Sequence, residues 1–126
     1  MSFGTSNPCF FWAKKKMTNR DIALEYLRCF CDGNIDGLSS LLAAGLRFSG
    51  TFHDYSSASE YLDSLRNDPP EKTKYKVLSI TEGDDSVAVF YEYQKPECVL
   101  QIAQLFKIRK CKIMEILLVF DGRNFT

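Results

Sequence analysis

The sequence predicts one α+β domain in which three N-terminal helices pack on a curved antiparallel sheet. Apolar residues at helical spacing dominate the first half of the chain, and four strand-like runs follow one another in the second half. Helices followed by a run of strands are typical of domains whose helices cover one face of an antiparallel sheet. The length of 126 residues suits one such domain better than two.

The first helix is predicted at residues 19–32, where apolar side chains recur at helical spacing. Thr18 and Asp21 resemble a capping box at its start. Gly33 follows the last apolar residue and supplies the left-handed position at which helices commonly end. A tight corner into the next element is therefore expected.

Local signals also predict two further helices. Asn34 is suited to cap a short second helix, and Ser57 with Glu60 resembles a second capping box. Residues 67–70, which include two prolines, end the third helix. Between these two helices, residues 46–52 are predicted to form a short strand.

The second half of the chain predicts an antiparallel meander. Its four strands are expected at residues 75–81, 86–94, 98–108 and 112–120. Turn-forming residues separate the first three strands, whereas the last gap, residues 109–111, contains no glycine. Alternation leaves both faces of the sheet partly apolar, so the face away from the helices is expected to form a homodimer interface.

Charge and hydropathy exclude several classes of partner. Sixteen basic residues balance sixteen acidic ones, so no nucleic acid partner is expected. No apolar stretch approaches the roughly 20 residues that span a bilayer, so no membrane partner is expected either.

The five cysteines show neither a CxxC pair nor zinc-like spacing, so neither a metal nor another cofactor is expected. Reduced thiols in the cytoplasm are the simplest interpretation of their odd number. Residues 1–16 place an apolar patch before a basic cluster, the reverse of a secretory signal. They are expected to be a disordered extension of a domain that covers residues 17–126.

Two segments carry a family resemblance. Residues 25–43 read EYLRCFCDGNIDGLSSLLA, and residues 100–121 read LQIAQLFKIRKCKIMEILLVFD. The first is similar to the helix, glycine and helix signature that opens the nuclear transport factor 2-like superfamily. The second resembles its closing hairpin, with Cys111 in place of the usual glycine. The SnoaL-like branch, which includes polyketide cyclases and ketosteroid isomerase-like proteins, is the most similar in character.

This resemblance implies a cone-shaped α+β barrel with an apolar pocket between the helices and the sheet. Matching against ketosteroid isomerase places Tyr26 at the oxyanion tyrosine, Gly50 at the aspartate base and Gln104 at the protonated aspartate. Gln104 retains a hydrogen-bond donor but cannot move a proton. The arginine and two aspartates of limonene epoxide hydrolase-like members have no counterpart in these strands.

Further pocket residues follow from the same resemblance or from their chemistry. His53, the single histidine, is a candidate general base, although an exposed loop position is the simpler interpretation. The superfamily's cavity-lining positions correspond here to Phe30, Phe48, Tyr61, Tyr91, Phe106 and Leu118. For these side chains, ordinary core packing is the alternative. Glu92 and Glu115 are expected to lie on the face opposite the pocket.

The leading hypothesis is a cytoplasmic, dimeric SnoaL-like protein that binds a small hydrophobic molecule and catalyses a proton transfer such as isomerisation or cyclisation. Two of the three catalytic positions tested are substituted, which favours the alternative of a non-catalytic ligand-binding or dimerisation module. A third possibility is an accessory domain that acts on another protein through its sheet face.

Overall fold

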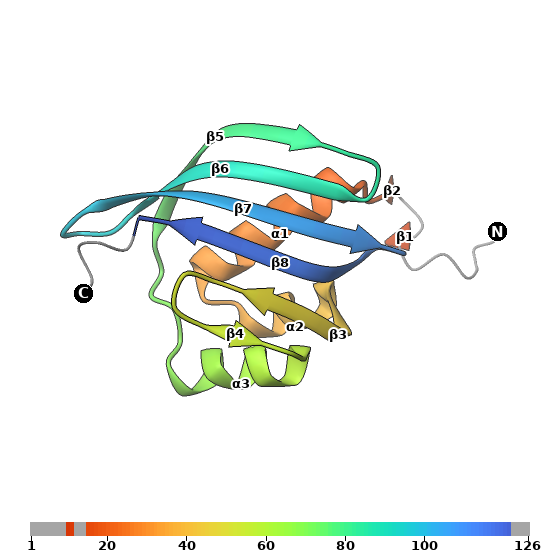
Figure 1. The fold of residues 1–126 in the computed structure, drawn as a ribbon, viewed down its shortest axis with the longest axis horizontal. Coiled ribbons are helices and arrows are strands. Elements are labelled where there is room, and N and C mark those ends of the chain that lie inside the picture. The colour runs from red at the N-terminus through yellow and green to blue at the C-terminus, as the bar shows by residue number, and fades with distance from the viewer. Residues whose placement is uncertain (1–9, 12–14, 122–126) are drawn as a thin grey trace.

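In the computed structural model, which describes residues 10–11 and 15–121, three helices lie against one face of a six-stranded sheet (Figure 1). The helices are α1 (Asn19–Asp32), α2 (Ile35–Leu41) and α3 (Ala58–Asn67). The sheet contains β3 (Leu42–Ser49), β4 (Asp54–Tyr55), β5 (Lys74–Glu82), β6 (Ser86–Gln94), β7 (Val99–Arg109) and β8 (Lys112–Phe120). The predicted α+β class and its three N-terminal helices are confirmed.

The ends of α1 form as the local sequence predicts. The Thr18 hydroxyl accepts a hydrogen bond from the Asp21 amide, and the Asp21 carboxylate accepts one from the Thr18 amide, which completes the capping box. Gly33 ends the helix with φ of 71°, in the left-handed region that glycine adopts without a steric penalty.

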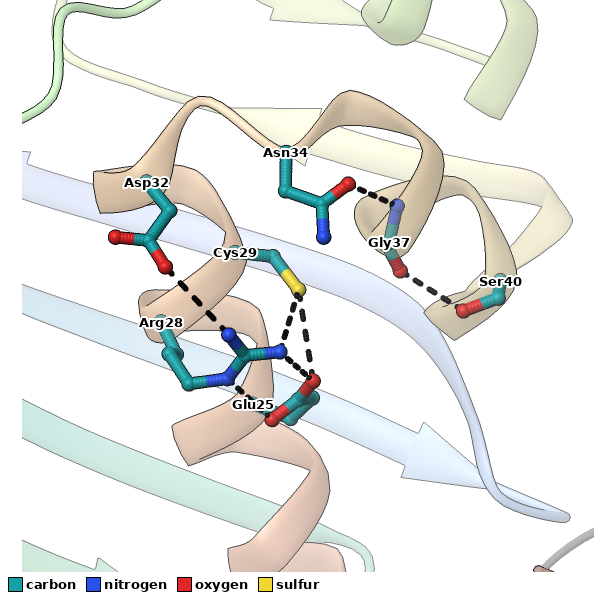
Figure 2. A network of polar contacts seen from close by, with 7 residues as sticks. All are labelled: Glu25, Arg28, Cys29, Asp32, Asn34, Gly37 and Ser40. Carbon is teal, nitrogen blue, oxygen red and sulfur yellow. Dashed lines mark hydrogen bonds and ion pairs between the residues drawn. The ribbon is translucent and has the colours of Figure 1, made fainter.

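Two sets of polar contacts lie on either side of the corner between α1 and α2 (Figure 2). The Arg28 guanidinium bonds to Glu25 and lies 3.5 Å from the Asp32 carboxylate. At the start of α2, the Asn34 side chain accepts a hydrogen bond of 2.9 Å from the Gly37 amide and caps the helix. Arg28 lowers the pKa of the Glu25 carboxyl chiefly by hydrogen bonding to it. Across the corner itself, the Asn34 amide donates a hydrogen bond of 2.8 Å to the Cys29 carbonyl oxygen.

The start of α3 differs in detail from the predicted capping box. The Ser57 hydroxyl accepts a hydrogen bond from the Glu60 amide, as expected. The Glu60 carboxylate, however, accepts from the amide of Ser56 at 2.9 Å, one residue before the cap. The amides of Ser56 and Glu60 are therefore both satisfied by side chains.

The strand order is β4-β3-β8-β7-β6-β5. Strands β5 to β8 form the predicted antiparallel meander, but β3 pairs with β8 in parallel. The expectation of a wholly antiparallel sheet is therefore wrong at this pair, because β3 and β8 are distant in sequence and no hairpin fixes their direction. The edge strands β4 and β5 do not pair, so the sheet is open and the expected barrel is not closed.

The hairpin between β7 and β8 forms without glycine. Lys110 and Cys111 adopt φ of 52° and 63°, the left-handed values that a two-residue type I′ turn requires. Strand β3 begins at Leu42 and ends at Ser49, so it starts earlier and ends earlier than predicted. Residues 50–53 instead turn the chain into the short strand β4.

The face of the sheet toward the helices forms the core. Strand alternation directs Val87, Val89, Phe106 and Ile116 to this side, where each is at most 1% exposed. The amphipathic helices contribute Ile22, Ala23, Leu27 and Leu38, which are equally buried. One apolar layer between helices and sheet therefore supports the cavity described below.

Part of the expected N-terminal extension lies outside the described residues. Within it, β1 (Phe10–Phe11) and β2 (Lys15–Lys16) pair with each other and not with the main sheet. None of the described helices is both long and apolar enough to cross a membrane.

Among the described cysteines, Cys29, Cys31 and Cys98 are free thiols, whereas Cys111 is disulfide-bonded. The expectation that the thiols are reduced is therefore wrong for Cys111. Burial raises the pKa of the Cys31 thiol to about 12, so this side chain stays protonated and unreactive at neutral pH.

We predict that Gly33→Ala destabilises the protein by about 1 kcal/mol, because an L side chain is strained at this left-handed position. An added Cβ would also lie 3.3 Å from the Pro70 carbonyl oxygen. Urea unfolding measures the change. Gly45→Ala is the matched control, since nothing lies within 4 Å of its added Cβ. Equal stability of the two variants would contradict the assigned cap.

Candidate functional site

A cavity of about 170 Å³ lies between α1, α3 and the inner face of the sheet. Aromatic side chains form most of its wall, and its polar groups are few. The lining residues are Tyr26, Phe30, Phe48, His53, Tyr55, Tyr61, Ser64, Leu65, Tyr91, Gln104 and Leu118. Cavities of this composition, mostly apolar with a few directed polar groups, are typical of small-molecule sites.

Two buried tyrosines join the helices across the cavity. Tyr26 of α1 and Tyr61 of α3 share a hydrogen bond between their hydroxyl groups. The apolar stripe of α1 directs Tyr26 inward, and Tyr61 occupies the buried side of α3. Both side chains are at most 3% exposed, so the pair lies at the closed end of the cavity.

The sheet contributes a second polar pair. Tyr91 of β6 donates a hydrogen bond of 2.7 Å to Oε1 of Gln104 on the neighbouring strand β7. Gln104 is only 2% exposed, and it is the one amide-bearing or charged side chain buried in the described core. Its Nε2 has no hydrogen-bond partner among the described residues. The structure therefore leaves a buried amide donor unused at the cavity wall.

This amide faces the tyrosine pair. It is close enough to Tyr26 to lower the pKa of that hydroxyl, but the contact does not meet hydrogen-bond geometry. Burial outweighs this effect and raises the pKa of the Tyr26 hydroxyl well above its ordinary value. Burial likewise raises the pKa values of Tyr61 and Tyr91. All three hydroxyls therefore remain protonated at neutral pH.

Stacked rings hold the wall in place. Phe48 of β3 stacks on Tyr61 with ring centroids 4.8 Å apart, and Phe30 stacks on Tyr26 at 6.1 Å. The edge of Phe106 meets the Tyr26 ring at 5.1 Å. Such offset and edge contacts are the favoured aromatic geometries, so each tyrosine is fixed on more than one side.

His53 is the one imidazole at the cavity. It lies in the turn between β3 and β4, is exposed to solvent and stacks on Tyr55 with centroids 6.2 Å apart. Within the described residues, no aspartate or glutamate lines the cavity. No group of three or more potential metal ligands occurs in the described part of the chain either.

Gly50 occupies the position that the resemblance assigns to a catalytic aspartate. A Cβ at this glycine would lie 3.0 Å from the Phe48 ring and 3.3 Å from the His53 carbonyl oxygen. The Gly50 amide also donates a hydrogen bond of 2.8 Å to that carbonyl, which closes the turn. A side chain at this position would therefore require the Phe48 ring and the backbone of the turn to shift by a few tenths of an ångström.

Eight of the nine residues proposed from sequence line this one cavity. The exception is Phe106, which is fully buried behind Tyr26 in the core and does not line the cavity. Sequence reasoning missed Tyr55, Ser64 and Leu65. Helical spacing from Tyr61 could have identified the last two, since residues three and four positions apart share a helix face.

Solved structures of several proteins share this fold. An NTF2-like protein from Cytophaga hutchinsonii is 21% identical, with a TM-score of 0.77 over 89% of this chain and 97% of that one. A SnoaL-like protein of unknown function from Burkholderia thailandensis is 17% identical, with a TM-score of 0.64 over 82% of this chain and 93% of that one.

A protein from Catenulispora acidiphila with a ketosteroid isomerase-like fold, solved in complex with trimethylamine, is 15% identical. Its TM-score is 0.67, over 82% of this chain and 88% of that one. No protein-family model and no curated protein matches the sequence. The chain thus has the fold of nuclear transport factor 2-like proteins, as its sequence resemblance predicts.

We predict that the buried tyrosines make the protein less stable above about pH 10. Their pKa values are higher in the folded than in the unfolded chain, so the stabilisation is complete below the unfolded value near 10 and is lost as the pH rises above it. Urea unfolding at pH 8 and pH 11 measures the loss.

Lysines also titrate at about pH 10, but they do so in the wild-type protein and in Tyr26→Phe alike. Comparing these two proteins therefore isolates the contribution of Tyr26. The variant should lose part of the pH dependence between pH 8 and pH 11. An identical dependence in the two proteins would show that Tyr26 ionises as easily in the folded state as in the unfolded one.

Proposed function

We propose that this protein binds a small, largely apolar molecule that carries a hydrogen-bond acceptor such as a carbonyl oxygen. The observation that supports this proposal is the unpartnered Nε2 donor of Gln104, which is 2% exposed and lies at the wall of an aromatic cavity. An unsatisfied buried donor costs about 1–3 kcal/mol. A ligand acceptor would remove this cost.

The hydroxyl groups of the tyrosine pair also favour a ligand that accepts hydrogen bonds. A single hydrogen joins the hydroxyls of Tyr26 and Tyr61, so the pair carries a second hydroxyl hydrogen that can be donated to a further acceptor. The Gln104 amide adds further donor hydrogens. Because the site offers more donors than it uses, it favours a ligand that accepts hydrogen bonds.

The volume of the cavity limits the part of the ligand that it encloses to about one ring. A cavity of about 150 Å³ lined by apolar side chains is sufficient for benzene, and the cavity here is about 170 Å³. The four rings of a steroid exceed this volume. The enclosed part of the ligand is therefore smaller than a ketosteroid, although it also carries an acceptor such as a carbonyl oxygen.

A second candidate function is proton transfer, which the position of His53 at the cavity favours. The tyrosines keep their protons at neutral pH, and an amide cannot take one. Among the described lining residues, His53 is then the one whose side chain is of a type that commonly acts as a general base. In this scheme it removes a proton beside a carbonyl whose oxygen is held by Gln104.

We further propose that a second copy of the chain covers the outer face of the sheet. Strand register places Phe90, Ala103 and Val119 in one row and Ala88, Leu105 and Leu117 in the next. Phe90, Leu117 and Val119 are each about half exposed, at 47%, 46% and 53%. An exposed apolar band of this kind is typical of protein interfaces.

Charged rows border this apolar band on both sides. Lys76 and Glu92 pair on one side, while Lys107 and Glu115 lie opposite each other on the other side and form an ion pair of 3.8 Å. Each border thus carries both signs, so it can meet opposite charge on a twofold-related copy. This arrangement favours a homodimer over a partner of uniform charge.

We predict that acetophenone binds about fivefold more tightly than ethylbenzene, because only acetophenone accepts a hydrogen bond from Gln104. Titrations followed by ¹H–¹⁵N NMR measure both affinities and the shift of the Gln104 side-chain amide. Trimethylamine is a cation at neutral pH and donates a hydrogen bond instead of accepting one, so it should bind more weakly than acetophenone. Equal affinities for the two aromatic probes would contradict the acceptor site.

Gln104→Met should bring the ratio of the affinities for acetophenone and ethylbenzene close to one, since it removes the donor while keeping a similar side-chain volume. Gln101→Met, on the exposed side of the same strand, is the matched control and should leave the preference unchanged.

Deuterium exchange of the bound acetophenone methyl group in D₂O distinguishes binding alone from proton transfer. If the wild-type protein catalyses this exchange and His53→Ala does not, the result supports a proton-transfer enzyme. If the wild-type protein catalyses no exchange, the result supports binding alone.

We predict that the protein sediments as a dimer and that Val119→Glu converts it to a monomer, because the new carboxylate lies in the apolar band. Sedimentation velocity measures the change. Ser39→Glu, on the exposed side of α2, adds the same charge away from the sheet and should leave the dimer intact. A monomeric wild-type protein at about 100 μM would be evidence against the interface.

A further inference from the structure

A second, larger hollow lies beside the cavity, at the end of the molecule where α1 and α3 terminate. Its volume is about 690 Å³. The connection from α3 to β5 (residues 68–73) and the turn after β6 form its rim, and Figure 1 shows both at the same end of the fold. We refer to it as the outer hollow and to the cavity of about 170 Å³ as the inner cavity.

The two spaces adjoin. Phe30 of α1 and Leu65 of α3 line both of them. Aromatic rings continue from one to the other: Tyr26 stacks on Phe30 at 6.1 Å, and Phe30 contacts Tyr93 at 6.5 Å. Tyr26 lines only the inner cavity and Tyr93 only the outer hollow, so these rings form a continuous wall along one path.

The rim of the outer hollow is anchored to the helix that carries this wall. The amide of Thr73 donates a hydrogen bond of 2.9 Å to the carbonyl oxygen of Cys31 in the last turn of α1. Pro69 and Pro70 end α3 and restrict the backbone of the same connection. The outer hollow is therefore built on fixed backbone rather than on side chains alone.

The chemistry of the two spaces differs. Among the described residues, no lysine, aspartate or glutamate lines the inner cavity. The outer hollow is lined by apolar side chains and by Asp68, Glu71, Lys72, Lys74 and Lys95. Lys95 already lies 4.0 Å from Glu97. Both signs of charge are present, so the outer hollow suits an uncharged polar group that donates and accepts hydrogen bonds.

We propose that the outer hollow is a second subsite, which takes the polar tail of an elongated ligand whose apolar ring occupies the inner cavity. The inference rests on the binding function proposed above and specifies the ligand class further, as an aryl ketone with a neutral, hydroxyl-bearing chain. The chain leaves the ring beside Phe30 and Leu65 and runs along the Tyr93 ring.

Acetophenone and 4′-(3-hydroxypropyl)acetophenone test this inference as a matched pair. The longer compound should bind at least about fivefold more tightly, because each methylene that is half removed from water contributes about twofold in affinity. NMR titration should shift the amides of residues 71–74 with the longer compound alone. Equal or weaker binding of the longer compound, with acetophenone still bound, overturns the second subsite and leaves the binding function intact.

Variants on neighbouring strands locate the tail. Tyr93→Ala should bring the affinity ratio of the two compounds close to one, since it removes the wall of the outer hollow. Tyr75→Ala is the matched control, because Tyr75 is the cross-strand partner of Tyr93 and lines neither space. A ratio that falls equally in both variants overturns the assignment to Tyr93. Failure of both compounds to bind the wild-type protein overturns the binding function together with this inference.

Discussion

Tyr26 is the residue on which both the core and the cavity depend. Its ring is held between Phe30 and the edge of Phe106, and its hydroxyl bonds to Tyr61. One side chain thus connects α1, α3 and the sheet. Its buried hydroxyl is matched by the hydroxyl of Tyr61, and the hydrogen-bonded pair of Tyr91 and Gln104 lies beside it. The polar groups of the site therefore lie around this one ring.

The features that the sequence predicts well are those set by local chemistry. The bounds of α1, β6 and β8 agree with prediction because caps, glycine and alternation act over a few residues. The parallel pairing of β3 with β8 joins residues such as Phe48 and Ile116, which are distant in sequence, and no local signal specifies it. The same limit explains Phe106, since alternation predicts that it faces inward but not that Tyr26 covers it.

Gly50, which stands where the family resemblance places a catalytic aspartate, is packed against the residues that build the site. The Phe48 ring lies close to Gly50 and also stacks on Tyr61, so the ring that crowds this position builds part of the cavity wall. An aspartate at this position would require small shifts of the Phe48 ring and of the turn that holds His53. The Phe48 ring thus contributes both to the crowding at Gly50 and to the apolar character of the cavity.

The burial of the cavity's hydroxyl groups determines where a proton could move. Every hydroxyl deep in the cavity keeps its proton at neutral pH because burial raises its pKa, so the interior can hold an acceptor but cannot serve as a base. The imidazole of His53 is exposed at the turn after β3, whereas Gln104 is buried at the wall. A ligand held by Gln104 must therefore extend toward the β3–β4 turn before a proton can leave it, and a molecule of about one ring in a cavity of about 170 Å³ has little length to spare for this. Ligand size, more than the identity of any single residue, thus decides between binding and catalysis at this site.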